Sequence, residues 1–275
     1  MITRTVSIPA EGAHLHAYLA APEGAGPWPA LIVIHEIWGL VPHIEDVARR
    51  FAGAGYAALA PDLYSRGAMP VPPDAIGRAM GFMQTIPIEE RRDPAAVARR
   101  VGALPDGDRE VIERALDWLQ NRDLGQNVRD LVAVRDWLAA QPFVDAGRVS
   151  SLGFCMGGAL SARLASSGAD LAGCVIFYGE NPPLGEVANI RCPVLGLYGG
   201  ADHRITDAVP ELAHEMAAAG KSFDARVYDG APHAFFNDSR EATYRPDAAR
   251  DAWERALAFL AAPGDRPAAG ARTGA

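Results

Sequence analysis

Short apolar runs recur along the chain, and turn residues close each of them. We expect six of these runs to form strands: residues 30–35, 56–60, 149–153, 173–178, 193–198 and 223–228. Most of the runs do not alternate between apolar and polar residues, which is typical of strands buried on both faces of a parallel sheet. Segments with a helical period lie between them. The pattern therefore predicts an α/β fold with a mostly parallel central sheet flanked by helices.

The helical period is clearest where apolar residues recur at i, i+3, i+4 and i+7. Three segments show this stripe: residues 44–51, 209–216 and 253–260. Leu131, Val134 and Leu138 predict a further helix. The start of the chain differs, because Thr3 to Ile8 and Ala13 to Ala20 flank a Glu11-Gly12 turn. We interpret these two segments as an antiparallel hairpin at the edge of the sheet.

Residues 65–124 contain no strand-like run and carry several charged clusters, so we expect a helical insertion there. Such an excursion can form a lid or binding loop, or it can be a set of solvated surface helices, and the pattern does not choose between them. We expect one domain over residues 1–262 that includes this insertion. Residues 263–275 have no periodicity, and their composition predicts a disordered tail.

Composition narrows the class of protein. The chain has 275 residues, of which 49% are hydrophobic, a balance typical of a globular protein. Its net charge is −8 and its basic residues are scattered, which argues against nucleic acid as a partner. No apolar run is long enough to span a bilayer, and the amino terminus lacks the apolar core of a signal peptide. We therefore expect a soluble, cytoplasmic protein that does not bind a membrane.

The sequence gives no support for a cofactor or a metal. Its three cysteines are an odd number without a C-x-x-C pair, so the sequence supports neither a disulfide framework nor a thiolate zinc site. His14 and His16 could face one side of a strand, but no third ligand with suitable spacing accompanies them. No glycine-rich nucleotide-binding motif occurs.

The most informative segment is residues 149–165, where a strand is followed by Gly153-x-Cys155-x-Gly157 and then by a helical stretch. This is the pattern of a nucleophile elbow with Cys in place of Ser. Glycines are needed on both sides because the sharp turn brings backbone too close for a Cβ. The start of the helix favours a thiolate at Cys155, and the amide of Met156 is a candidate oxyanion donor. A buried structural cysteine beside a tight turn is the alternative.

An elbow of this kind predicts an acid and then a histidine downstream, each after a strand. Asp202 follows the apolar run 193–198, and His233 follows the run 223–228. Either residue alone could serve as a turn or structural residue. Together with Cys155 they predict a nucleophile, an orienting acid and a base.

The loop after the first core strand provides the second oxyanion amide in this architecture, and Ile37 is the candidate donor. Glu36 precedes it, and a carboxylate buried there is costly unless it is paired or protonated. It could hydrogen-bond the thiol of Cys155. It could instead hold loop backbone or pair with an arginine.

These motifs resemble those of the dienelactone hydrolase family, the cysteine members of the α/β-hydrolase superfamily. The resemblance rests on three sequence blocks at residues 34–40, 55–64 and 153–159 and spans most of the chain. It implies an α/β-hydrolase fold and a triad of Cys155, His233 and Asp202. It also implies that Glu36 partners the resting thiol and that the amides of Ile37 and Met156 bind the oxyanion.

The family's type reaction is the hydrolysis of dienelactone, an enol lactone whose carboxylate is held there by two arginines. The position of one, four residues after the histidine, is Asn237 here. The other would fall in the insertion, where Arg109 and Arg114 are candidates. An amide cannot replace a bidentate guanidinium.

We therefore expect an ester or lactone hydrolase that forms a thioester at Cys155 and acts on a small molecule. A general carboxylesterase or thioesterase acting on uncharged substrates is an alternative that Asn237 favours. A third hypothesis is a non-catalytic binding module that has kept the triad residues.

Overall fold

A computed structural model describes residues 1–66, 71–87, 90 and 93–262 of the chain. The predicted tail, 263–275, lies outside the described residues. The strands are β1 (Ile2–Ala10), β2 (Ala13–Ala21), β3 (Trp28–Ile34), β4 (Ala57–Pro61), β5 (Val144–Phe154), β6 (Cys174–Phe177), β7 (Val194–Gly199) and β8 (Phe223–Tyr228). The helices are α1 (Pro42–Gly53), α2 (Pro73–Thr85), α3 (Pro94–Gly102), α4 (Asp106–Gln120), α5 (Leu124–Ala139), α6 (Met156–Ser166), α7 (His203–Thr206), α8 (Val209–Ala218), α9 (Pro246–Ala261) and the 3-10 helix η1 (Leu184–Asn189).

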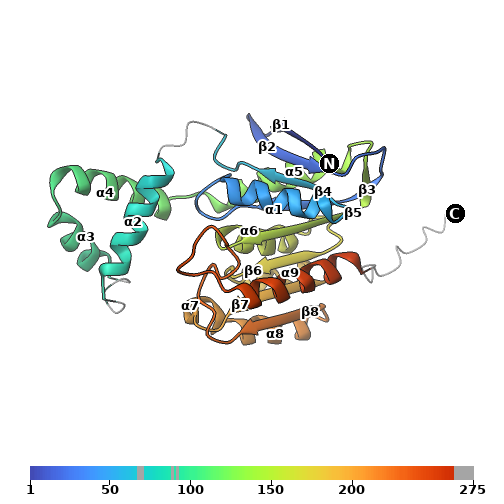
Figure 1. The fold of residues 1–275 in the computed structure, drawn as a ribbon. Helices are drawn as coiled ribbons and strands as arrows, with labels where there is room; N and C mark the ends of the chain where they lie inside the picture. The colour runs from blue at the N-terminus through green and yellow to red at the C-terminus, as the bar shows by residue number, and fades with distance from the viewer. Residues whose placement is uncertain (67–70, 88–89, 91–92, 263–275) are drawn as a thin grey trace. The chain divides into compact units, whose positions relative to one another are not determined.

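The strands form one mixed sheet in the order β1-β2-β4-β3-β5-β6-β7-β8 (Figure 1). The predicted hairpin is present: β1 and β2 pair antiparallel from Ile2 opposite Ala21 to Ala10 opposite Ala13. Strand β2 also runs antiparallel to β4, and all pairings from β4 to β8 are parallel. The predicted mostly parallel sheet with an antiparallel edge is confirmed.

Helices cover both faces of this sheet. Helices α1 and α9 lie on one face, and α5, α6 and α8 lie on the other (Figure 1). The face under α1 and α9 packs Val33, Phe154 and Phe177 of the strands against Phe51 of α1 and Ala252 of α9. Central strands are buried on both sides, which is why their sequences read as continuous apolar runs. Strand β8 is the exception, because it forms an edge and its middle residues are exposed.

The described chain divides into two compact units. The first comprises Met1–Leu63 together with the chain from Gly125 onward, and it contains the sheet. The second is Tyr64–Leu124, which contains α2, α3 and α4 and, among its described residues, no strand. Within it α2 packs against α4, and Asp93 caps α3 by accepting a hydrogen bond from the amide of Ala95 at 2.9 Å. The prediction of a single domain over 1–262 stays a prediction.

None of the described helices is long and apolar enough to cross a bilayer. The same part of the chain brings together no group of three or more His, Cys, Asp or Glu side chains that could hold a metal ion.

Candidate active site

Cys155 occupies the sharp turn between β5 and α6. Its backbone has φ 55° and ψ −117°, a region that L residues rarely adopt. The glycines on either side permit this turn. A Cβ on Gly153 would lie 2.0 Å from the carbonyl oxygen of Gly157, and a Cβ on Gly157 would lie 2.3 Å from that of Ile34. The half-buried thiol therefore stands at the carboxyl end of the sheet.

The elbow also contacts the loop that follows β3. The same Cβ on Gly157 would lie 2.5 Å from the carbonyl oxygen of His35, so the backbone of this loop lies directly against the first turn of α6. Met156 is the first residue of α6, and Ile37 follows shortly after His35 in the loop. The two predicted oxyanion amides therefore belong to neighbouring segments beside Cys155.

Asp202 and His233 follow β7 and β8 and form a close pair. The imidazole donates from Nδ1 to Oδ2 of Asp202 across 2.5 Å. Their two loops fit against each other because a Cβ on Gly199 would lie 2.5 Å from the carbonyl oxygen of Ala231. The amide of Ala201 also donates to that oxygen at 3.0 Å. The Asp202 side chain is 9% exposed and that of His233 is 33% exposed. Of the two, the imidazole is therefore the group that solvent reaches.

The other edge of the imidazole interacts with the thiol. Burial by itself lowers the pKa of His233, but hydrogen bonds to Asp202 and Cys155, together with the charges of both groups, raise it to about 10. A histidine with a raised pKa keeps its second proton over a wider pH range, so this ring favours the imidazolium form. Cys155, Asp202 and His233, which follow β5, β7 and β8, thus lie in one row at the carboxyl ends of these strands.

The other two cysteines lie in different surroundings. Cys174 is completely buried in β6, where burial raises the pKa of its thiol to about 11 and Ser161 hydrogen-bonds it at 3.3 Å. Burial also raises the pKa of Cys192. Both thiols therefore stay protonated near neutral pH, whereas Cys155 is the thiol beside a histidine.

Glu36 is buried beside this row and has a partner that the sequence did not indicate. Its side chain is 2% exposed, and Oε2 accepts a hydrogen bond from Nδ2 of Asn237 at 2.9 Å. We expected the thiol, loop backbone or an arginine as its partner. The side-chain amide of Asn237, itself 2% exposed, takes that place for Oε2. The oxygen of Asn237 accepts from the amide and hydroxyl of Ser239, at 3.1 and 2.6 Å.

His35 anchors the loop that carries Glu36. It is completely buried, its Nδ1 donates to the carbonyl oxygen of Glu36 at 2.5 Å, and its Nε2 accepts from the amide of Leu63 at 3.2 Å. Burial lowers the pKa of His35, which keeps the ring neutral and suited to one donor and one acceptor role. This histidine holds the loop.

Two further residues of the site were missed by sequence reasoning. Tyr178, directly after β6, is completely buried, and its ring meets that of His233 edge-on at 5.1 Å between centroids. Its φ of 40° is a strained value for a side-chain-bearing residue. Arg240 places its guanidinium 4.8 Å above the ring of Trp38, in the loop after Glu36. Nothing in the local sequence distinguishes either residue from ordinary packing or surface charge.

The arginines predicted to clamp a substrate carboxylate lie in the second unit. Arg109 and Arg114 are both on α4, and Arg109 pairs with Asp106 at 2.6 Å. His14 lies on β2, where its Nδ1 is 3.3 Å from the hydroxyl of Ser7.

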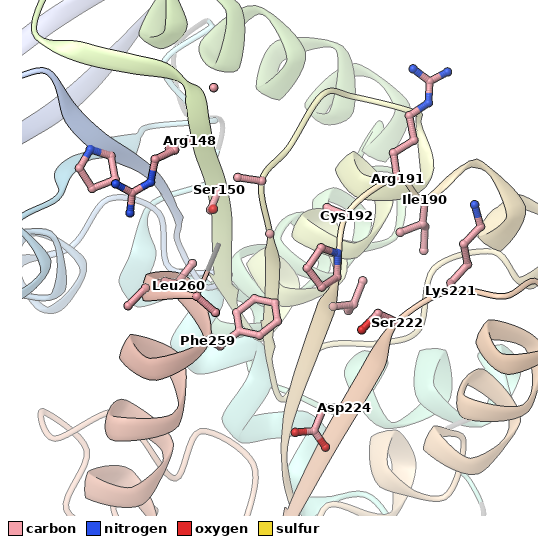
Figure 2. A pocket seen from close by; sticks show the side chains of 18 of the residues that line it. Arg148, Ser150, Ile190, Arg191, Cys192, Lys221, Ser222, Asp224, Phe259 and Leu260 are labelled. Atoms are coloured by element: carbon pink, nitrogen blue, oxygen red, sulfur yellow. The ribbon is translucent and has the colours of Figure 1, made fainter. Parts of the chain in front are cut away.

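A large cavity of about 1170 Å³ lies elsewhere, at the amino ends of β5 to β8. Its lining includes Arg148, Ser150, Cys192, Lys221, Asp224 and Phe259, and no member of the Cys155 row. Figure 2 shows Arg148 and Arg191 on opposite sides of this cavity. It is separate from the candidate active site.

The sequence matches the model of the dienelactone hydrolase family over residues 15–263. Two curated relatives carry the name "Putative carboxymethylenebutenolidase". One, from Saccharolobus solfataricus, is 39% identical over 251 residues, which cover 91% of this chain and 95% of the relative. The other, from Methylorubrum extorquens, is 32% identical over 266 residues and covers 93% and 79% of the two chains.

A solved structure shares both the fold and the sequence pattern. The protein from Klebsiella pneumoniae described as a "Putative Dienelactone Hydrolase" superposes with a TM-score of 0.71 and is 32% identical. The match covers 94% of this chain and 98% of the Klebsiella chain.

Proposed function

The chain belongs to the dienelactone hydrolase family, has the α/β-hydrolase fold and is a carboxylic ester hydrolase; from this premise we propose that Cys155, His233 and Asp202 form its catalytic triad. One observation carries the proposal. His233 interacts with the Asp202 carboxylate through Nδ1, at 2.5 Å, and with the Cys155 thiol at the same time. That is the arrangement a nucleophile, base and orienting acid require.

In the proposed reaction, Sγ of Cys155 attacks the carbonyl carbon of an ester or lactone, with its proton held by His233. The amides of Ile37 and Met156 stabilise the oxyanion of the tetrahedral intermediate. The intermediate collapses, the C–O bond breaks, and His233 gives the proton to the leaving oxygen. A thioester remains on Cys155. Water, deprotonated by His233, then attacks the thioester, releases the acid and regenerates the thiol.

Thiolate chemistry favours substrates with good leaving groups. A poor alkoxide leaving group lets the tetrahedral intermediate expel the thiolate instead, whereas an enolate or phenolate departs first. The proposed substrates are therefore activated esters and enol lactones rather than amides.

A general esterase acting on uncharged substrates is the second candidate, and Asn237 favours it. This amide occupies the position of a family arginine and is already engaged with Glu36 and Ser239. The nearby cation of the same loop is Arg240, whose charge acts on Tyr178 at the base of the site. The guanidinium of Arg240 lies over the ring of Trp38, and among the described residues no carboxylate forms an ion pair with it. Its positive charge therefore favours the first candidate, with an anionic substrate.

Substrate profiling separates these two candidates. Steady-state hydrolysis of dienelactone and of p-nitrophenyl acetate is measured side by side, with Cys155→Ala as the blank. Preference for dienelactone by orders of magnitude supports an anionic lactone substrate. Preference for the uncharged ester supports the general esterase, and full turnover by Cys155→Ala contradicts both.

A further inference from the structure

The large cavity at the amino ends of β5 to β8 takes no part in the proposed reaction. Its volume of about 1170 Å³ exceeds the range of roughly 300–1,000 Å³ that is typical of small-molecule sites, so it can hold a ligand of that size. All the residues that line it belong to the unit that contains the sheet. Much of its wall is apolar and is formed by Pro29, Ile190, Pro193, Val194, Phe259 and Leu260.

Two hydroxyl groups in this wall have no hydrogen-bond partner. Tyr56 and Ser150 are each only 6% exposed, and neither side chain makes a hydrogen bond within the described part of the chain. Buried hydroxyls in folded proteins usually have such a partner. Because both residues line the cavity, a ligand there can supply the missing acceptor. Burial raises the pKa of Tyr56, so its hydroxyl keeps the proton and acts as a donor.

Arg148 adds a positive charge at the same end of the cavity. Arg148 and Ser150 are two residues apart on β5, so their side chains leave the same face of the strand, and Figure 2 shows them on one side of the cavity. The charge of Arg148 also acts on the hydroxyl of Tyr56. No carboxylate of the described chain forms an ion pair with Arg148. One guanidinium and two hydroxyl donors therefore gather at this end.

The other charged residues of the wall also favour an anionic ligand. Arg191 and Lys221 are further cations, and Asp224 is the one carboxylate among the described lining residues. The charge of Asp224 acts on Arg255 of α9, outside the cavity. The chain as a whole has a net charge of −8, so this wall has the opposite sign to the rest of the protein. Such a local reversal attracts anions.

An apolar surface adjoins the two hydroxyls. A Cβ on Gly173 would lie 3.1 Å from the ring of Phe259 and 3.5 Å from Oγ of Ser150, so the ring and the hydroxyl border the same small space. Figure 2 shows Leu260 next to Phe259. A ligand with its anionic end at Ser150 would therefore lay its body along apolar side chains.

We propose that this cavity binds an organic acid with an apolar body, whose carboxylate accepts hydrogen bonds from Tyr56 and Ser150 and pairs with Arg148. A guanidinium matches the two oxygens of a carboxylate. A small inorganic anion would leave the apolar wall uncovered, and an uncharged alcohol would leave Arg148 without a partner. The site lies apart from Cys155, so this inference does not depend on the proposed triad.

The test is calorimetric titration of the protein with octanoate, 1-octanol and acetate at constant ionic strength. We expect saturable binding of one octanoate per chain. We expect 1-octanol, which lacks the charge, and acetate, which lacks the apolar body, to bind at least about tenfold more weakly. Absence of saturable octanoate binding, or equal affinity for octanoate and acetate, overturns the proposal.

Three variants place the bound octanoate. Tyr56→Phe keeps the ring and its edge contact with Phe51, at 6.1 Å between centroids, and removes only the hydroxyl. Ser150→Ala removes the other hydroxyl. We expect each to weaken octanoate binding roughly tenfold, because a hydrogen bond to a charged group is lost. Arg148→Gln should weaken the binding of octanoate and leave that of 1-octanol unchanged.

Tyr198→Phe is the matched control. Its hydroxyl is also buried without a partner in the described chain, but Tyr198 does not line the cavity, so we expect the affinity of the wild type. Hydrolysis of p-nitrophenyl acetate at the wild-type rate shows that each variant is folded. Octanoate affinity that stays unchanged in Tyr56→Phe, Ser150→Ala and Arg148→Gln places the acid elsewhere and overturns the proposal.

Discussion

The imidazole of His233 donates to the carboxylate of Asp202 across 2.5 Å, although 31 residues separate the two along the chain. This bond orients the ring, because Nδ1–H points to Asp202 and Nε2 is left to face the thiol. The Asp202 side chain is only 9% exposed, so the bond is shielded from competing water.

Replacing Asp202 by Asn tests that bond. The amide keeps the size of the carboxylate but can stabilise the wrong tautomer, and it cannot balance an imidazolium. We expect kcat for p-nitrophenyl acetate to fall on the order of 10³- to 10⁴-fold. Asp207→Asn is the control, because its exposed carboxylate contacts only the exposed His203, at 3.2 Å, among described side chains. Equal activity of both variants would remove Asp202 from the mechanism.

The raised pKa of His233 predicts how stability depends on pH. Its value of about 10 lies above the ordinary 6.5, so between these values the folded protein binds more protons than the unfolded chain. The contribution of His233 is therefore complete below pH 6.5 and is lost as pH rises through about 10. One full proton would change the unfolding free energy by roughly 1.4 kcal/mol per pH unit. We expect a smaller slope, because a third of the His233 side chain is exposed and solvent screens its interactions.

Urea unfolding of the wild type and of His233→Asn over this pH range measures that dependence. The free energy of unfolding of the wild type should fall with rising pH more steeply than that of the variant. Parallel curves for the two proteins would show that His233 is not held as imidazolium.

Gly157 tests the packing that forms the elbow. In Gly157→Ala, the new Cβ lies 2.3 Å from the carbonyl oxygen of Ile34 and 2.5 Å from that of His35, both backbone atoms. The first turn of α6 must shift, and we expect a loss of about 2–4 kcal/mol in unfolding free energy together with most activity. Gly53→Ala is the control, since a Cβ there meets nothing within 4 Å at the end of α1. A stable, active Gly157→Ala would contradict the close approach.

Asn237 is expected to hold Glu36 through its amide group. Asn237→Asp keeps an oxygen that accepts from Ser239. It removes the NH₂ group that donates to Oε2 of Glu36 and puts a second carboxylate oxygen in that buried position. We expect the free energy of unfolding, measured by urea, to fall by about 1–3 kcal/mol. The loss should be larger at high pH, where both carboxyls are ionised. Asn121→Asp is the matched control because its amide donates to Asp117 at 2.8 Å on an exposed face of α4. Equal losses in the two variants would mean that burial of the Glu36 pair is unimportant.

The features that neighbouring residues determine, such as strands and the elbow, could be predicted from the sequence. Contacts between residues far apart in the chain could not. The elbow at Cys155 is encoded by glycines two residues away on each side, and the strands by apolar runs. These are short-range steric and hydrophobic rules. The partner of Glu36 lies 201 residues away in the chain, and no local pattern selects Asn237 over the alternatives.

The surroundings of Tyr178 could not be predicted from the sequence either. Its sequence environment is an apolar strand end, which predicts packing and nothing more. Its place beside His233 and Glu36 arises because β6 lies between β5 and β7 in the sheet, and only the three-dimensional order reveals that.

The central claim is that Cys155 is the nucleophile that carries the acyl group. The most direct measurement is mass analysis of the protein quenched during turnover of p-nitrophenyl acetate, with the acetylated peptide identified. We expect acetyl on the Cys155 peptide, none on Cys174 or Cys192, and neither label nor turnover in Cys155→Ala. Acetyl on another residue, or turnover that survives Cys155→Ala, would contradict it.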